Sequence, residues 1–236
     1  MGFEAVLFDC DGVLVDSEPI THAVLLAALN DAGWALGAEE CTAIFMGKAV
    51  RDERPRIERE TGKPLTDTWM AEFWARRNEA LQLHLLPVPH IHDAVAAIHA
   101  ATQGLIACAS GADRYKVELQ LRKVGLEAYF AGRVFSGHEM PRSKPAPDVY
   151  LAAATAMGVP PGRCAVVEDT VTGIAAGVAA GATVFAYAPT GGGELLLSAG
   201  ANAVFHSMAD LPALLGLVGI KAQDKFAIRS AGSVVA

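Results

Sequence analysis

A chain of 236 residues is long for a minimal single core and short for two full-sized domains, which favours one large core or a core with an inserted lobe. Hydrophobic residues make up 52% and charged residues 19%, which excludes a disordered or low-complexity protein. The formal net charge of -7 argues against duplex nucleic acid as the main partner, because that binding requires a surplus of lysine and arginine.

The sequence predicts neither a membrane segment nor a signal peptide. No uncharged apolar run reaches the roughly 18–20 residues that cross a bilayer, and Asp and Glu occur too early in the chain for a signal peptide. The four cysteines lie far apart and form no C-x-x-C pair. This spacing favours reduced thiols in the cytoplasm over a disulfide framework or a zinc site.

Short, continuous apolar runs alternate with segments of helical spacing, which is typical of strands buried on both faces and joined by helices. We predict strands at 5–8, 105–109, 134–135, 165–167, 183–186 and 203–205, and helices at 91–101, 115–124, 148–157 and 173–180. The alternation predicts an α/β fold, a doubly wound parallel sheet with helices on both faces. In such sheets reactive groups gather at the carboxyl ends of the strands.

A block without a convincing strand separates the first two predicted strands. Residues 16–19 have the pattern of a helix start, with a capping side chain before Pro19, and Gly33 can end that helix. Helical patterns also cover 50–60 and 66–84. We therefore predict an all-helical cap of residues 17–86, inserted into a core of residues 1–16 and 87–236. The prolines at residues 86–89 suit a stiff hinge strand at the return point.

Two aspartates follow the first predicted strand. Asp9 and Asp11 are separated by one residue, and burying such a pair is costly unless a cation compensates the charge. Mg²⁺ prefers carboxylate and carbonyl oxygens. Gly12 permits a sharp turn, which would direct the backbone N–H groups of residues 10–12 toward one bound anion. Taken alone, the pattern more often marks a solvated acidic turn.

Further polar residues follow the other predicted strands. Glu168 and Asp169 end the fourth strand, Ser110 ends the second, and Lys144 lies in the loop after the third. The sheet topology would bring these strand ends together, so four carboxylates would form a site for a hard cation. The hydroxyl of Ser110 and the ammonium of Lys144 would bind an anion held there. Singly, these two residues would be a helix cap and a surface lysine.

The ordered motifs resemble those of the haloacid dehalogenase superfamily over nearly the whole chain, from Phe3 to about Leu215. Four motifs carry the resemblance: FDCDGVLVDSE from Phe8, CAS from Cys108, SKPAPDVY from Ser143 and VVEDTVTGI from Val166. The helical block after the first motif is similar to the cap of the beta-phosphoglucomutase and phosphoglycolate phosphatase-like branch.

The resemblance implies a role for each matching residue. Asp9 would be the nucleophile that forms an aspartyl-phosphate, and Asp11 the general acid and then the base. Mg²⁺ would be held by the Asp9 carboxylate, the Asp11 backbone carbonyl and Asp169, with Glu168 helping directly or through water. Ser110 and Lys144 would bind the phosphoryl group, together with backbone donors around Cys10 and Gly12. Dehalogenases usually carry tyrosine, and phosphonoacetaldehyde hydrolases alanine, where this chain has Asp11.

Substrate choice would come from the cap, where Glu18, Lys48 and Arg51 are candidate contacts. For Lys48 and Arg51, the solvated face of a helix is an equal alternative. We predict a cytoplasmic, Mg²⁺-dependent phosphatase, monomeric or weakly dimeric, that acts on a small sugar or sugar-acid phosphate. The alternatives are a beta-phosphoglucomutase-like phosphomutase, which shares these motifs, a phosphonatase, and a non-catalytic metabolite-binding module.

Overall fold

The computed structural model describes residues 2–45, 50–217 and 227–228. The chain divides into two compact units, one of Met1–Val15 and Pro87–Ala236, the other of Asp16–Leu86. The first boundary lies one residue before the predicted one. Within the described ranges, no helix combines the length and the apolar character needed to cross a membrane.

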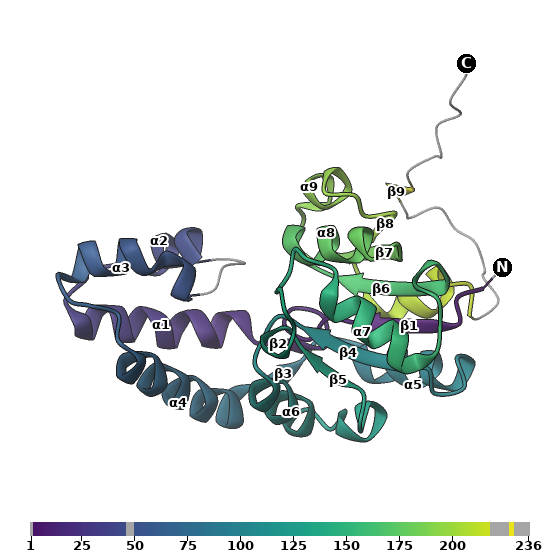
Figure 1. Cartoon of the computed structure of the whole chain (residues 1–236), viewed down its shortest axis with the longest axis horizontal. Coiled ribbons are helices and arrows are strands. Elements are labelled where there is room, and N and C mark those ends of the chain that lie inside the picture. Colours follow the sequence, from purple (N-terminus) through teal and green to yellow (C-terminus); the bar gives the residue numbers. More distant parts are fainter. Residues whose placement is uncertain (1, 46–49, 218–226, 229–236) are drawn as a thin grey trace, which may run out of the picture. The chain divides into compact units, whose positions relative to one another are not determined.

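The larger unit is built on a sheet with β1 near its middle (Figure 1). Its parallel strands, in spatial order, are β5 (Val134–Ser136), β4 (Ile106–Ser110), β1 (Ala5–Phe8), β6 (Cys164–Glu168), β7 (Thr183–Tyr187) and β8 (Ala203–Phe205). A short strand, β9 (Ala227–Ile228), pairs antiparallel with β8. Because β4 and β6 flank β1, the carboxyl ends of these three strands are neighbours.

Helices pack against both faces of this sheet. They are α5 (Ile91–Ala101), α6 (Arg114–Lys123), α7 (Asp148–Met157), α8 (Val171–Ala179), α9 (Gly193–Ser198) and α10 (Leu211–Leu214), with 3-10 turns η2 (Glu127–Phe130), η3 (Gly137–Glu139), η4 (Pro161–Arg163) and η5 (Met208–Asp210). Successive side chains of a strand point to opposite faces. Leu7 joins a core cluster with Tyr150 of α7 and Ile174 of α8, whereas Phe8 packs edge-to-face on Phe130 of η2.

The structure confirms the predicted fold class and the six predicted strands. The helices at 91–101 and 148–157 have the predicted bounds. Helix α8 begins two residues earlier than predicted, at Val171, because the Thr170 hydroxyl caps it by accepting a hydrogen bond from the Gly173 N–H at 3.1 Å.

The smaller unit is helical and has a core of its own. It contains α1 (Glu18–Ala32), α2 (Ala38–Phe45), η1 (Val50–Glu53), α3 (Arg54–Thr61) and α4 (Asp67–His84). Trp34 belongs to its apolar cluster, and Trp69 and Trp74 pack against that cluster. Two details differ from the prediction: α2 was not foreseen, and Ser17 stands at the N-cap of α1 without a side-chain capping bond.

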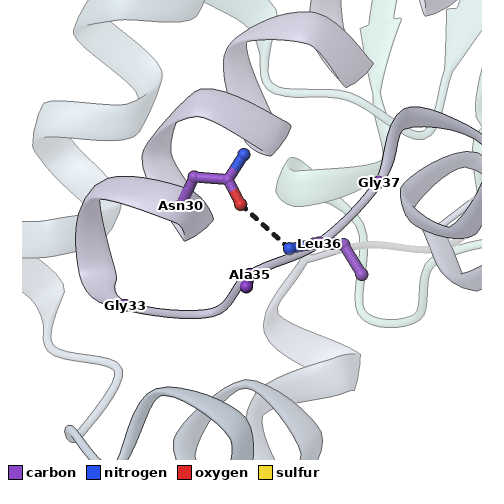
Figure 2. A pocket seen from close by; sticks show the side chains of 5 residues that line it. All are labelled: Asn30, Gly33, Ala35, Leu36 and Gly37. Carbon is purple, nitrogen blue, oxygen red and sulfur yellow. Dashed lines mark hydrogen bonds between the residues drawn. The ribbon is translucent and has the colours of Figure 1, made fainter.

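The turn between α1 and α2 is stabilised locally. Gly33 ends α1 in the left-handed conformation, with φ of 107°, and the Leu36 N–H donates to Asn30 Oδ1 at 3.0 Å (Figure 2). An open depression here is lined by Asn30, Gly33, Ala35, Leu36 and Gly37. None of these five side chains carries a charge or a titratable group.

The chain passes between the two units twice. The passages are short strands, β2 (Val15–Asp16) and β3 (Leu86–Pro87), which pair with each other in a two-stranded sheet. The sequence indicated the second of these strands from its prolines and missed the first, whose two residues are too short a run to show a period.

Candidate active site

The predicted strand ends do meet in the larger unit. Phe8, the last residue of β1, lies opposite Cys108 of β4 on one side and Val167 of β6 on the other. Asp9 follows directly, and its N–H donates to the Val167 carbonyl at 3.0 Å. Asp9 therefore sits between the ends of β4 and β6, and the residue is only 7% exposed.

Lys144 connects the first and fourth motifs. Its Nζ donates to Asp9 Oδ1 at 2.6 Å and to Glu168 Oε1 at 2.6 Å. The ammonium also lies 4.8 Å from the centre of the Tyr150 ring, and the Tyr150 hydroxyl donates to Glu168 Oε1 at 2.8 Å. One lysine from a loop thus bridges two carboxylates from neighbouring strands and offsets one of their two charges.

The second oxygen of Glu168 is equally occupied. Oε2 accepts from the Asp169 N–H at 3.0 Å, from the Thr170 N–H at 3.2 Å and from the Thr170 hydroxyl at 3.1 Å. Glu168 is completely buried, and such a carboxylate requires this many donors. Its first task in this arrangement is to hold Lys144 and the turn after β6.

Burial and charge together set the protonation of the buried groups. Burial raises the pKa of Asp9 to about 7, with Lys144 acting in the opposite direction and Glu168 in the same one. Burial alone would lower the pKa of Lys144 and raise that of Glu168. The charges of Asp9 and then Glu168 outweigh burial and hold the pKa of Lys144 well above its ordinary value. The charge of Lys144 and the hydrogen bonds to Glu168 likewise hold the pKa of Glu168 below its ordinary value.

The carboxylates at these strand ends form a donor set suited to a hard cation. Oxygens of Asp9, Glu168 and Asp169 lie within 4.8 Å of one another. Oxygen donors of this kind fit Mg²⁺. Gly12 is required by the same geometry, because a Cβ at this position would lie 1.9 Å from Asp169 Oδ2 and the residue has φ of 75°.

Gly12 does not have the predicted role as an anion donor. Its N–H donates to the Val15 carbonyl at 2.8 Å, so this donor is used within the turn after β1. The turn closes on the Cys10 carbonyl, which accepts from Leu14 at 2.9 Å and Val15 at 3.1 Å. Gly12 therefore contributes conformation and space, and its N–H stabilises the turn instead of facing an anion.

Asp11 is held by two residues that the sequence analysis missed. Lys116 Nζ donates to both Asp11 carboxylate oxygens at 2.8 Å, and Gln120 Nε2 donates to Oδ1 at 2.7 Å. Both residues lie one turn apart on α6 and are buried. Polar residues at i and i+4 beside the apolar Val117 and Leu121 were the signal that could have revealed them.

Ser110 and Cys10 complete the surroundings of Asp9. The Ser110 Oγ accepts from the Ala112 N–H at 3.1 Å, and its own proton remains available for donation to an anion. The Cys10 side chain is buried. The neighbouring Cys108 thiol, followed by burial, raises the pKa of Cys10 well above its ordinary value, so the thiol stays protonated.

Comparison with known families decides the classification. Residues 3–181 match the family model described as haloacid dehalogenase-like hydrolase. The chain belongs to this family. The match spans all four motifs that meet at the carboxyl ends of β1, β4 and β6.

Relatives of this haloacid dehalogenase-like hydrolase include named phosphatases. A 6-phosphogluconate phosphatase of Escherichia coli is 32% identical, covering 77% of this chain and 81% of the relative. A fructose-1-phosphate phosphatase of E. coli is 30% identical, covering 76% and 93%. A family hydrolase from Deinococcus radiodurans, whose crystal structure holds phosphate and sodium, is 33% identical with a TM-score of 0.75, covering 92% and 98%.

The candidate specificity residues belong to the helical unit of this hydrolase. Arg51 in η1 pairs with Asp67 at 3.0 Å and lies 5.3 Å from the centre of the Trp74 ring. Glu18 lies half-buried in the first turn of α1. Lys48 lies outside the described residues. Their contact with substrate stays a prediction.

Proposed function

We propose that this haloacid dehalogenase-like hydrolase is a Mg²⁺-dependent phosphatase that removes phosphate from a small sugar or sugar-acid phosphate. The observation that carries the proposal is Lys144, shared between Asp9 and Glu168 beside the three-carboxylate cluster. A buried carboxylate nucleophile, an ammonium and a cation site are the parts that phosphoryl transfer requires. The substrate class is supported by the relatives named for 6-phosphogluconate and fructose 1-phosphate.

In the first step, a carboxylate oxygen of Asp9 attacks the phosphorus of the ester. The bond between phosphorus and the ester oxygen breaks, and Asp11 gives its proton to the departing oxygen. Lys144 and the Ser110 hydroxyl bind the oxygens of the transferring group. The products are the free alcohol and a phosphorylated Asp9.

In the second step, water attacks the phosphorus of the phosphorylated Asp9. Asp11, now ionised, accepts a proton from that water, and the bond between phosphorus and the Asp9 oxygen breaks. Inorganic phosphate leaves, Asp9 is again a carboxylate and Asp11 is again protonated. Two displacements at one carboxylate replace one difficult displacement by water.

The cation would be held by Asp9, Asp169 and the Asp11 carbonyl, with Glu168 beside them. When bound, it would balance the charge of carboxylate and phosphate and stabilise charge on the transferring group. Hydrogen bonds from Lys144, Tyr150 and the Thr170 hydroxyl already occupy Glu168, so Glu168 would act mainly by fixing its neighbours.

The four free and buried cysteines suit a reducing compartment, which supports a cytoplasmic location. We also expect a monomer or a weak homodimer.

The test is phosphate release from a panel of sugar and sugar-acid phosphates, with Mg²⁺ and with EDTA. We expect turnover of at least one ester with Mg²⁺, none in excess EDTA, and recovery when Mg²⁺ is restored. Asp9→Asn should abolish turnover and keep the fold, since an amide cannot form the acyl phosphate. Phosphate release by that variant, or full activity in EDTA, would contradict the mechanism, and an isomerised sugar phosphate would instead indicate a mutase.

A further inference from the structure

We propose that Lys116 and Gln120 position the Asp11 carboxylate at the leaving-group side of Asp9. The inference rests on the proposed function, because it needs Asp11 to serve the departing oxygen. Lys116 and Gln120 are positioning residues here, since they contact Asp11 and not the reacting phosphorus.

The hydrogen bonds leave the Asp11 carboxylate little freedom. Lys116 Nζ lies 2.8 Å from each oxygen, and Gln120 Nε2 lies 2.7 Å from Oδ1. The Lys116 side chain is only 9% exposed, against 25% for Asp11. A buried ammonium that contacts both oxygens fixes the rotation of the carboxylate as well as its location.

The same bonds hold the Asp11 carboxylate apart from the carboxylate cluster, although the Asp11 backbone carbonyl would be a cation ligand. Among the described residues, the carboxylate cluster comprises Asp9, Glu168 and Asp169, and two of these three come from the end of β6. Asp11 is held by α6, which follows β4 on the other side of β1. The two flanks of Asp9 therefore carry different groups, carboxylates for a cation on one and a proton-transfer group on the other.

Cys10 sets the orientation of the Gln120 amide. The Cys10 thiol donates to Gln120 Oε1 at 3.4 Å, which leaves Nε2 facing Asp11. Cys10, which lies between Asp9 and Asp11 in the sequence, thus supports Asp11 through Gln120 of α6. Without these contacts the Asp11 side chain could rotate, and a proton donor displaced by about 1 Å costs up to roughly 100-fold in rate.

The test compares two leaving groups in the variant Lys116→Met. The sugar phosphate that the wild-type enzyme hydrolyses fastest needs a proton on its leaving alkoxide, whereas p-nitrophenyl phosphate releases a stable phenolate. Since kcat/KM reports the first step, we expect kcat/KM to fall about 10- to 100-fold for the sugar phosphate and only a few-fold for p-nitrophenyl phosphate. Lys116→Arg, which keeps the charge, should restore part of the loss.

Lys123→Met, an exposed lysine of the same helix, is the matched control and should leave both values unchanged. An equal loss on both substrates, no loss, or a gain in Lys116→Met would overturn the inference while wild-type turnover still supports the proposed function. An inactive wild-type enzyme would overturn both. If Lys116→Met does not fold, Gln120→Met gives the same ratio test, and an unchanged ratio there counts against the inference.

Discussion

At the scale of single residues, the buried Glu168 is the most strongly constrained group of the site. Its two oxygens accept from Lys144, Tyr150, the Asp169 N–H and both donors of Thr170. A carboxylate removed from water tolerates no loss of such partners without cost. The residues that contact Glu168 should therefore tolerate substitution as poorly as the residues proposed to bind the phosphate.

The first prediction concerns Gly173, in the first turn of α8. A Cβ here would lie 1.7 Å from Glu168 Oε1 and 1.9 Å from its Cδ. Although alanine favours helix, Gly173→Ala should lower the free energy of unfolding by about 1–3 kcal/mol through overpacking and reduce phosphatase activity by displacing Glu168. Urea denaturation and phosphate release measure the two effects.

Gly37→Ala is the matched control, because no atom lies within 4 Å of its Cβ position and the residue does not have a positive φ. It should change neither stability nor turnover appreciably. Wild-type stability and activity in Gly173→Ala would show that Glu168 is less constrained than its contacts indicate.

At the scale of elements, helix α6 connects the loop after β4 with Asp11, which lies after β1. The side chain of Asp113 caps the helix by accepting from the Lys116 N–H at 2.9 Å. The cap therefore fixes the backbone of the residue whose ammonium holds Asp11. Lys116 therefore couples the stability of the first turn of α6 to the orientation of Asp11.

Asp113→Ala should consequently cost about 1 kcal/mol of unfolding free energy and lower kcat/KM for sugar phosphate more than for p-nitrophenyl phosphate. Thr66→Ala removes the corresponding cap of α4, where Thr66 accepts from the Trp69 N–H at 3.1 Å. It should cost a similar amount without altering the ratio between the substrates. If the ratio of kcat/KM between the two substrates were the same in both variants, the α6 cap would have no effect on the orientation of Asp11.

Elements differ in how far the sequence predicts them. The strands were predictable because continuous apolar runs mark burial on both faces, and the strand ends then brought together Asp9, Lys144 and the acidic pair of β6. Lys116, Gln120 and Tyr150 were not, since their roles arise from packing between segments about 20 to 110 positions apart. Helix α2 was missed because a segment of 8 residues is too short to establish a helical period.

At the scale of the whole molecule, the three-carboxylate cluster proposed to hold the cation and Lys144, proposed to bind phosphate, all belong to the unit of Met1–Val15 and Pro87–Ala236. The helical unit of Asp16–Leu86 has its own apolar cluster. The insertion of the helical unit therefore leaves the carboxylate cluster and Lys144 together in one unit. Any ion that binds there stabilises the folded over the unfolded chain.

Magnesium should thus raise the melting temperature by several degrees. At 100 times its dissociation constant, a ligand adds about 2.7 kcal/mol, and for a chain of this size each kcal/mol corresponds to about 2–4 °C. Asp169→Asn should lose most of the shift, whereas Asp67→Asn, an exposed aspartate of the helical unit, should keep it. Thermal unfolding in MgCl₂ against NaCl of equal ionic strength measures this, and an undiminished shift in Asp169→Asn would contradict the donor assignment.

The contact of Lys144 with two carboxylates also predicts the order in which the cation and the substrate bind. Asp9, Glu168 and Asp169, when ionised, carry three negative charges, and Lys144 offsets one of them. The remaining two equal the charge of a single divalent ion. Under the proposed function, a phosphoester dianion that approached first would meet a net negative charge, so we expect the cation to bind before the ester.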